Sequence, residues 1–388
     1  MFIRRTDRGL LANWWFTVDR PFLAVFLLLM AIGLLINMAS SPAVAARIDL
    51  APFHFVKRQI IFLVPAIAVL LATSFLSVQA AKRVCVAAFA VSVALVLLTL
   101  QIGAEVKGAT RWLNVGSFAV QPSELLKPAF IVVCAFFFAE KILKPDMPGN
   151  IISAVLLVGC ASLLVLQPDY GQTILLCAVW VMMLFVTGVS WIWIMGLIGL
   201  GIGGLVMAYM TAPHVASRID RYLYPDGGDT YQVDMAKDAF ERGGLIGTGP
   251  GGGNVKQIIP DAHSDFTFAV AGEEFGALAC ILLLAIFCYV VVRGLNKAMN
   301  EDDPFRRLAV TGLISLFGLQ AVINMGVNVA LLPAKGMTLP FISYGGSSLL
   351  SMAFAMGLVL SLTRRRAAGK VLDDLPASSI AHPQLVRS

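Results

Sequence analysis

Residues 22–40 read FLAVFLLLMAIGLLINMAS, a stretch without a charged side chain. About 20 such residues in a row form a helix long enough to cross the ~30 Å hydrocarbon core of a membrane. The chain repeats this pattern nine more times, at 59–78, 83–101, 122–140, 150–167, 171–188, 191–211, 266–292, 308–332 and 342–363. These runs are continuously apolar, whereas the strands of a membrane barrel alternate. The sequence therefore predicts an all-α polytopic membrane protein, a bundle of about ten transmembrane helices.

The composition agrees with this fold class. Of the 388 residues, 58% are hydrophobic and 13% are charged. The net charge of +6 comes from Lys and Arg that flank the apolar runs, so it gives no reason to expect a nucleic-acid partner. All six cysteines lie within the apolar runs, and no disulfide framework is predicted.

The Lys and Arg residues of the short connections predict the orientation. Connections and tails on one side of the bundle hold 16 of them, and the short loops on the other side hold six. Because cytoplasmic segments carry the excess, both termini are predicted to be cytoplasmic. The chain then divides into a cytoplasmic tail (1–20), a transmembrane domain (21–363) with one long extracytoplasmic loop (212–265), and a cytoplasmic, disordered tail (364–388).

The most unusual polar segment is PDAHSDFTFAVAGEEFG at 260–276, which runs from the long loop into an apolar run. Asp265 lies at the mouth of the predicted helix, and Glu273 and Glu274 follow about 12–14 Å deeper at the α-helical rise. Carboxylates at such depth are costly, which favours a functional role. The alternative is that Asp265 caps the helix and the glutamates form structural pairs. This segment alone favours neither reading.

A second polar group opens the run at 122–140, where Glu124 and Lys127 lie at i and i+3 on one helical face. They are explained equally well as a local ion pair and as a cationic group at the outer mouth, able to bind Asp265 or an anionic lipid headgroup. Arg111 precedes this run in KGATRWLNVGSF. An arginine at an outer membrane surface suits pyrophosphate, although it can also be a solvated loop charge.

Two polar stripes with i+4 spacing occur toward the C-terminus. Gln320, Asn324 and Asn328 are best explained as interhelical hydrogen-bonding groups. The second stripe consists of three serines that lead into the last run: Ser343, Ser347 and Ser351. Lys335 lies in the outer loop between the two stripes.

The long outer loop contains seven glycines in GGLIGTGPGGG at 243–253. This segment lacks the Lys–Ser/Thr ending and the preceding strand of a phosphate-binding P-loop, so we predict a mobile lid or hinge. The sequence shows no cluster of His and carboxylate residues with metal-ligand spacing, and no metal ligand is assigned from spacing.

The motifs GATRW, QPSELLK, LQPDYG, PDAHSDF, AGEEFG and LLPAKGMTLPFISYGGSS follow one another between Gly108 and Leu350. In this set the chain resembles the SEDS family (shape, elongation, division, sporulation) of bacterial cell-wall polymerases. The last motif is more similar to the division member than to the elongation member. Three departures from the family pattern are Ser264, where Thr is commoner, Thr110, where Arg or Ser is frequent, and a glycine-rich 250–253 that bears on the lid geometry.

The resemblance implies a peptidoglycan glycosyltransferase that polymerises lipid II at the outer face of the bacterial inner membrane, at the division septum. Its implied partners are a class B penicillin-binding transpeptidase and other division proteins. The family's essential aspartate falls on Asp265, and its acidic and basic pair falls on Glu124 and Lys127. The candidates for substrate binding or electrostatic support are Lys127, Glu124, Arg111, Glu274, Lys335 and Ser347.

The implied reaction fits these residue types. Asp265 acts as general base on the acceptor hydroxyl, and a single displacement inverts the donor's anomeric centre without a second nucleophilic carboxylate. The leaving pyrophosphate needs a cation, which Lys127, Arg111 or a divalent metal (Mg²⁺ or Mn²⁺) can supply. No organic cofactor is implied.

Two other functions share some of these features. A transporter that flips lipid II also has many spans, intramembrane glutamates and broken helices. It should place its key charges near the midplane in related repeats, whereas the carboxylate–lysine group is predicted at the outer mouth. A non-catalytic scaffold of the division machinery is the third reading, because the sequence does not show activity without a partner.

Overall fold

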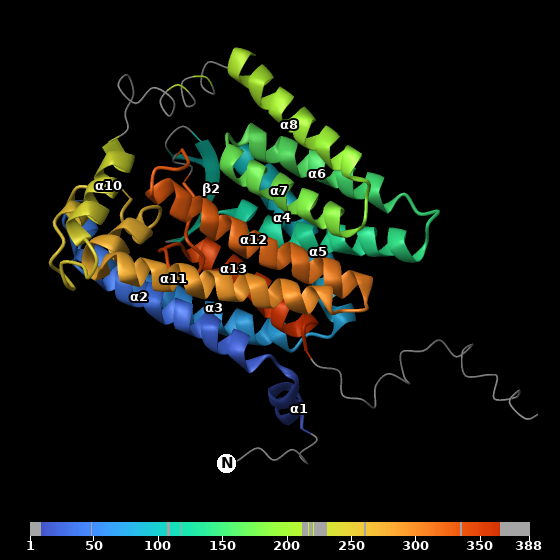
Figure 1. Ribbon diagram of the computed structural model, residues 1–388, viewed down its shortest axis with the longest axis horizontal. Coiled ribbons are helices and arrows are strands. Elements are labelled where there is room, and N and C mark those ends of the chain that lie inside the picture. Colours follow the sequence, from blue (N-terminus) through green and yellow to red (C-terminus); the bar gives the residue numbers. More distant parts are fainter. Residues whose placement is uncertain are drawn as a thin grey trace, which may run out of the picture.

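The computed structural model describes residues 9–47, 49–106, 109–116, 118–211, 216, 220, 231–259, 261–333 and 336–364. Each predicted apolar run corresponds to one helix of the bundle in Figure 1: α2 (Arg20–Arg47), α3 (His54–Ser74), α4 (Val78–Ile102), α5 (Pro122–Leu143), α6 (Gly149–Leu166), α7 (Tyr170–Val186), α8 (Trp191–Thr211), α11 (Thr267–Met299), α12 (Pro304–Asn328) and α13 (Gly346–Leu362). Within the described residues, seven of these helices are long and apolar enough to cross a membrane, and α7 and α13 are shorter apolar helices. The helical membrane bundle is confirmed.

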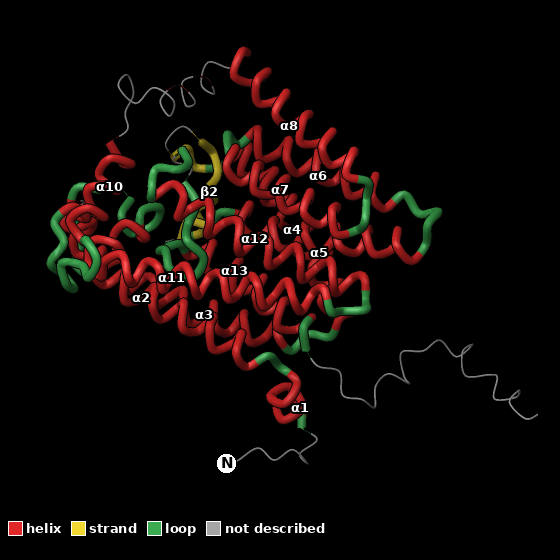
Figure 2. The backbone as a smooth tube through the Cα atoms, in the orientation of Figure 1, coloured by secondary structure: helices red, strands yellow, loops and turns green. Residues whose placement is uncertain are grey.

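The connection between α4 and α5 departs from the all-α prediction, because it folds into a small antiparallel sheet (yellow in Figure 2). The strands β1 (Ala104–Val106), β2 (Ala109–Val115) and β3 (Phe118–Val120) pair in this order. Leu113 lies opposite Val120, and Gly116 at φ +60° permits the tight turn between β2 and β3. The sheet packs on α4 and α5 and so places Arg111 close to the end of the bundle.

Among the described residues, three shorter helical elements lie outside the spans. Helix α1 (Leu10–Thr17) falls within the segment predicted as a cytoplasmic tail, and the buried Trp14 donates from Nε1 to Ser74 Oγ over 2.9 Å. Helix α10 (Tyr231–Gly243) and the 3-10 turn η2 (Val255–Gln257) belong to the long loop before α11. Both pack against α11, so this part of the loop is folded onto the bundle.

Helix α12 is the enclosed centre of the bundle, and α8 is its periphery. The apolar window of α12 is 83% buried, whereas that of α8 is 6% buried, in agreement with its place at the edge in Figure 1. Small residues allow the close contacts of α12. A Cβ atom on Gly312 would lie 2.5 Å from Ile131 of α5 and 2.6 Å from Met183 of α7. Polar side chains on α12 therefore face other helices rather than lipid.

Helix α11 is interrupted at Gly276, which adopts φ 77° and ψ 178°. Beyond the kink, the backbone N–H groups of Ala277 and Leu278 donate to the carbonyls of Gly244 and Leu245, over 2.9 and 3.2 Å. A Cβ atom at Gly276 would lie 2.4 Å from the Leu245 carbonyl oxygen. Glycine at 276 thus provides both the backbone conformation and the space that let the glycine-rich loop pack on the kink.

Candidate functional site

Asp265 lies in the turn directly before α11 and is half-buried. Its backbone N–H donates to the Asp261 carbonyl over 3.1 Å, which closes the turn. Its own carbonyl accepts two hydrogen bonds of 2.9 Å, from the side-chain amides of Asn324 and Asn328. The carboxylate faces the segment after α12, since a Cβ atom on Gly336 would lie 3.6 Å from Asp265 Oδ2. The backbone at Asp265 is therefore fixed by α12.

The polar stripe of α12 makes the interhelical hydrogen bonds predicted for it: Gln320 accepts from the Lys127 ammonium group, and the two asparagines bind mainly backbone groups. Asn324 also donates to the Met337 carbonyl over 2.6 Å. Asn328 also donates to the Asn324 carbonyl over 2.8 Å, and its Oδ1 accepts from the Ala269 N–H over 2.9 Å. A side-chain amide has two N–H donors, and both are used in each asparagine. The two asparagines thus hold the Asp265 turn, the start of α11 and the 336–338 segment together.

Glu124 and Lys127 form the predicted local ion pair, with both carboxylate oxygens 3.0 Å from Lys127 Nζ. Lys127 is 1% exposed, so it lies inside the bundle rather than at its surface. It also donates to the amide oxygens of Gln172 on α7, over 2.7 Å, and Gln320 on α12, over 3.2 Å. An ammonium group has three N–H donors, and these partners account for all of them. In this arrangement Lys127 is available to position other groups rather than to contact a substrate directly.

The lysine cluster and the Asp265 turn are joined through the segment after α12. Gln320 binds Lys127 with its oxygen and donates from Nε2 to the Thr338 carbonyl over 3.1 Å. Met337, the preceding residue, is bound by Asn324. Successive members of the α12 stripe are about 6 Å apart along the helix. One helix face therefore connects the buried cation to the exposed end of the site.

Arg111 connects β2 to the turn between α6 and α7. Its Nε donates to the Gln167 carbonyl over 3.2 Å, its Nη2 donates to the Pro168 carbonyl, and its Nη1 lies 3.6 Å from Asp169 Oδ1. Burial raises the pKa of Asp169 above its ordinary value of 3.8, and the charges of Arg111 and Lys127 partly offset this increase. Arg111 therefore has protein partners in this structure.

Ser347 and Asp169 meet at the start of α5. The Gln121 N–H donates to Ser347 Oγ over 3.0 Å, and the Gln121 side chain donates to Asp169 Oδ2 over 3.4 Å. The sequence analysis assigned no role to Asp169 or Gln172. Both lie in or directly after the quoted motif LQPDYG, which was the available signal for them.

Glu273 and Glu274 hold the glycine-rich loop on α11. The Glu273 carboxylate accepts from the backbone N–H groups of Val255, at 2.7 Å, and Lys256, at 2.9 Å. Glu274 is ion-paired with the Lys256 ammonium group and accepts from the Gly251 N–H over 3.1 Å. Glu274 is only 1% exposed, and its carboxylate is bound to the loop. These contacts favour a role in anchoring the loop over contact with a substrate. The segment predicted as a mobile lid is bound to the helix in this structure.

Two further predictions from the sequence concern Lys335 and a divalent metal ion. Lys335, like Lys107, lies outside the described residues. Within the described ranges, no group of three His, Cys, Asp or Glu side chains is arranged to hold a metal ion. The site brought together by the structure thus consists of Asp265, its α12 asparagines and the Glu124–Lys127 pair.

A family model described as "Cell cycle protein", which carries the names FtsW, RodA and SpoVE, matches residues 19–368. The chain belongs to this family. The match includes every residue of the site and agrees with the SEDS motifs in the sequence. Two relatives carry the name "Probable peptidoglycan glycosyltransferase FtsW". The one from Caulobacter vibrioides is 44% identical over 363 residues, 93% of each chain, and the one from Escherichia coli O157:H7 is 32% identical over 353 residues, 89% of this chain and 85% of its own.

Solved structures of the family have the same fold. A chain from "Structural coordination of polymerization and crosslinking by a peptidoglycan synthase complex" superposes with a TM-score of 0.76 at 25% identity, covering 90% of this chain and 98% of that one. The crystal structure of Thermus thermophilus rod shape determining protein RodA gives a TM-score of 0.67 at 26% identity, covering 90% and 97%. The arrangement of the ten helices is therefore that of an FtsW/RodA/SpoVE protein.

Proposed function

We propose that this chain is an inverting peptidoglycan glycosyltransferase that polymerises lipid II for septal wall synthesis in cell division. The observation that carries the proposal is the Asp265 turn, a half-buried carboxylate at a helix mouth whose backbone is fixed by two asparagines of the central helix. The full-length similarity to proteins named peptidoglycan glycosyltransferase FtsW supports the reaction and the division role.

Asp265 is the general base in this proposal. Its carboxylate takes the proton from the acceptor sugar hydroxyl while that oxygen attacks the donor's anomeric carbon and the lipid pyrophosphate leaves. A base must keep its position as the proton moves, because a shift of about 1 Å can lower the rate about 100-fold. The hydrogen bonds of Asn324 and Asn328 to the Asp265 carbonyl supply this rigidity without using the carboxylate.

The Glu124–Lys127 pair supports the reaction from inside the bundle. Lys127 is bound to Gln320, which holds Thr338 next to the residue bound by Asn324. Lys127 thereby positions the 336–338 segment that faces Asp265. A divalent cation, Mg²⁺ or Mn²⁺, would be held by the Asp265 carboxylate and would stabilise the negative charge of the leaving pyrophosphate, because Mg²⁺ commonly binds one or two carboxylates together with substrate phosphates.

The site is proposed to face the outside of the inner membrane, as the Lys and Arg distribution predicts. Both substrates are lipid-linked, so a site at the membrane–water boundary gives access to the acceptor, the donor and solvent. A class B penicillin-binding transpeptidase is the proposed partner, in accordance with a structural relative described as part of a peptidoglycan synthase complex.

The flippase alternative is less compatible with the polar groups of the bundle. A transporter site is expected at the midplane between related repeats. Here Gln172 lies in the first turn of α7, Lys127 lies in the second turn of α5, and the Asp265 turn precedes α11 altogether. The charges and amides are displaced toward one membrane surface, where a polymerase needs them.

The first test is polymerisation of lipid II by the purified protein, with and without its transpeptidase. Asp265→Asn keeps the size of the side chain and the backbone hydrogen bonds of the turn. The amide cannot take the proton from the acceptor hydroxyl, so we expect glycan synthesis to fall at least about 100-fold. Asp261→Asn removes one negative charge from the same turn at a φ of 54° that Asn tolerates, and is the matched control. An Asp265→Asn protein with near wild-type polymerisation would refute the assigned base.

Proteoliposomes with lipid II confined to one leaflet distinguish a polymerase from a flippase. Polymer should form when that leaflet is on the side of Asp265, and transbilayer movement of lipid II should stay at the protein-free level. Protein-dependent movement of lipid II without polymer would favour the flippase. Absence of both activities with the transpeptidase present would favour the scaffold.

A further inference from the structure

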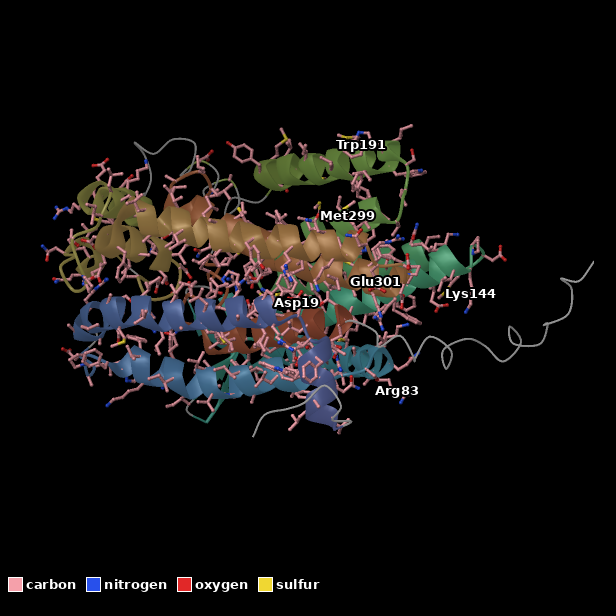
Figure 3. All side chains as sticks on the ribbon, turned by 60° about the horizontal axis from the view of Figure 1, so that its bottom comes forward. Asp19, Arg83, Lys144, Trp191, Met299 and Glu301 are labelled. Atoms are coloured by element: carbon pink, nitrogen blue, oxygen red, sulfur yellow. The ribbon has the colours of Figure 1, made fainter. Side chains whose placement is uncertain are left out.

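A shallow, open groove runs along the exposed side of α11 in its C-terminal half, away from Asp265, and α11 with its C-cap residue Asn300 supplies all of its lining. It extends from Ala285 to Asn300 with a volume of about 650 Å³. From Ala285 to Lys297 the helix rises about 18 Å, close to the ~15 Å that one leaflet contributes to the hydrocarbon core. Figure 3 shows Met299, at the end of this helix, on the same side of the molecule as Arg83 and Lys144. That is the end predicted to be cytoplasmic.

The lining changes in character along the groove. Its deeper part is lined by small and apolar side chains, including Ala285 and Val292, and Val292 is 58% exposed. Tyr289, 41% exposed, lies between Ala285 and Val292 along the helix. Arg293 and Lys297 line the end near the surface. An apolar surface that ends at two cations matches the polarity of an anionic phospholipid.

The two cations are assembled around one buried carboxylate. Arg293 Nη2 lies 3.0 and 3.1 Å from the two oxygens of Asp19, and Lys297 contacts Asp19 Oδ2. The Asp19 side chain is 2% exposed, whereas Arg293 and Lys297 are 33% and 29% exposed. Burial acts to raise the pKa of Asp19, but hydrogen bonds from Lys297 and Arg293 outweigh it and lower the pKa below 3.8. Asp19 is thus ionised at neutral pH, and the three groups carry a net charge of about +1.

The arginine is held in place before any ligand arrives. Its guanidinium carbon lies 5.5 Å from the Phe22 ring and 5.8 Å from the Tyr289 ring. Such cation–π contacts reduce the number of side-chain conformers that a ligand must order. Of the acidic residues in the following turn, Asp303 accepts from the Phe305 N–H over 2.9 Å, Glu301 is partly buried and Asp302 is exposed. Arg293 and Lys297 are both partly exposed, so a phosphate can approach them along α11 from the lipid side.

We infer that this groove binds an anionic phospholipid of the inner leaflet, with its headgroup phosphate on Arg293 and Lys297 and an acyl chain along Val292 and Ala285. Basic pockets at the cytoplasmic ends of membrane helices favour such headgroups. The inference rests on the predicted orientation and is independent of glycan polymerisation. Asp19 limits the affinity in this arrangement, because it neutralises one of the two cations.

The test is native mass spectrometry of the purified full-length chain in detergent, with phosphatidylglycerol or phosphatidylcholine of identical acyl chains. We expect wild type to retain phosphatidylglycerol in preference. Arg293→Gln with Lys297→Gln should weaken that binding at least about tenfold. Lys141→Gln with Lys144→Gln removes the same charge from the same side at the end of α5 and should leave the binding unchanged. Melting temperatures identify any variant that fails to fold.

Asp19→Asn supplies a test in the opposite direction. It frees both cations, so it should strengthen phosphatidylglycerol binding while lowering the melting temperature. A purely structural cluster would lose stability without any gain in lipid binding, and that result would overturn the inference. Two other results would overturn it as well. One is an equal loss of phosphatidylglycerol binding in the Lys141/Lys144 and Arg293/Lys297 double variants, and the other is displacement of the lipid by millimolar inorganic phosphate.

Discussion

The described part of the chain contains two buried Glu–Lys pairs with different surroundings. Glu124–Lys127 lies within α5 and is completed by neutral side-chain amides from α7 and α12. Glu274–Lys256 joins α11 to the glycine-rich loop, and its additional donor is the Gly251 backbone N–H. The first pair connects three helices to the segment that faces Asp265, whereas the second fastens one loop to one helix. Burial of a pair therefore does not indicate its role, but the identity of its additional partners does.

The largest expected effect comes from neutralising the central pair. Lys127→Met alone leaves Glu124 charged and buried, which costs about 3–5 kcal/mol. Glu124→Gln with Lys127→Met removes both charges and should restore most of the melting temperature. If the cation positions the site, the double variant should still lose polymerisation about 100-fold or more. If the double variant recovers both activity and stability, the Glu124–Lys127 pair has only a structural role.

Substitution of Asn324 and Asn328 on α12 tests whether the hydrogen bonds to the Asp265 turn are needed for activity. Asn324→Ala and Asn328→Ala each remove one of the two donors to the Asp265 carbonyl, so kcat should fall about 10- to 100-fold with little change in KM. Ser315→Ala, on the same helix, is the control, because the buried Ser315 hydroxyl has no hydrogen-bond partner among the described residues. A rise in KM at constant kcat would instead assign the asparagines to substrate binding.

Neutralising the loop pair should have a smaller effect on activity. Lys256→Met removes the ion-pair partner of the buried Glu274 carboxylate and should therefore lower the melting temperature. Glu274→Gln with Lys256→Met keeps the loop contacts without charge, and its polymerisation should stay within about threefold of wild type. A double variant that is stable but inactive would give Glu274 the substrate role predicted from the sequence.

The smallest expected effect is on the pH dependence of stability that Asp169 produces in the turn between α6 and α7. Because burial raises the pKa of Asp169, its contribution to stability is present below its ordinary pKa of 3.8 and is lost as the pH rises through the higher folded-state value. Asp169→Asn should therefore gain stability relative to wild type over the pH range above about 4. Melting temperatures across this range measure the difference, and one that does not vary with pH would contradict the prediction.

The sequence predicted the helices well because each span is a predominantly apolar run of about 20 residues, and such runs are recognised without tertiary information. It also located the Glu124–Lys127 pair, since i and i+3 positions on a helix are neighbours whatever surrounds them. The partners of Asn324 and Asn328 were not predictable, because they are backbone carbonyls of distant segments and carry no residue-type signal. The sheet at 104–120 was missed because its strands are short and depend on packing against α4 and α5.

Glutamates 273 and 274 illustrate a different limit. Depth in the membrane marked them as costly, and that cost is real, but backbone N–H groups and Lys256 offset it. Periodicity gave no sign that α11 breaks at Gly276 and receives the loop there. A carboxylate deep in a predicted span thus indicates a required partner, which can be the protein's own backbone.

The break at Gly276 has a consequence for the order in which the chain assembles. The amides of Ala277 and Leu278 are not satisfied within a regular helix and depend on carbonyls of residues that precede α11 by more than 20 positions. Residues 244–245 must therefore dock before α11 reaches its final form around the kink. During biosynthesis, the protons of these two amides should exchange with solvent until the loop docks, and a proline placed at 277 or 278 should arrest maturation after all ten helices have inserted.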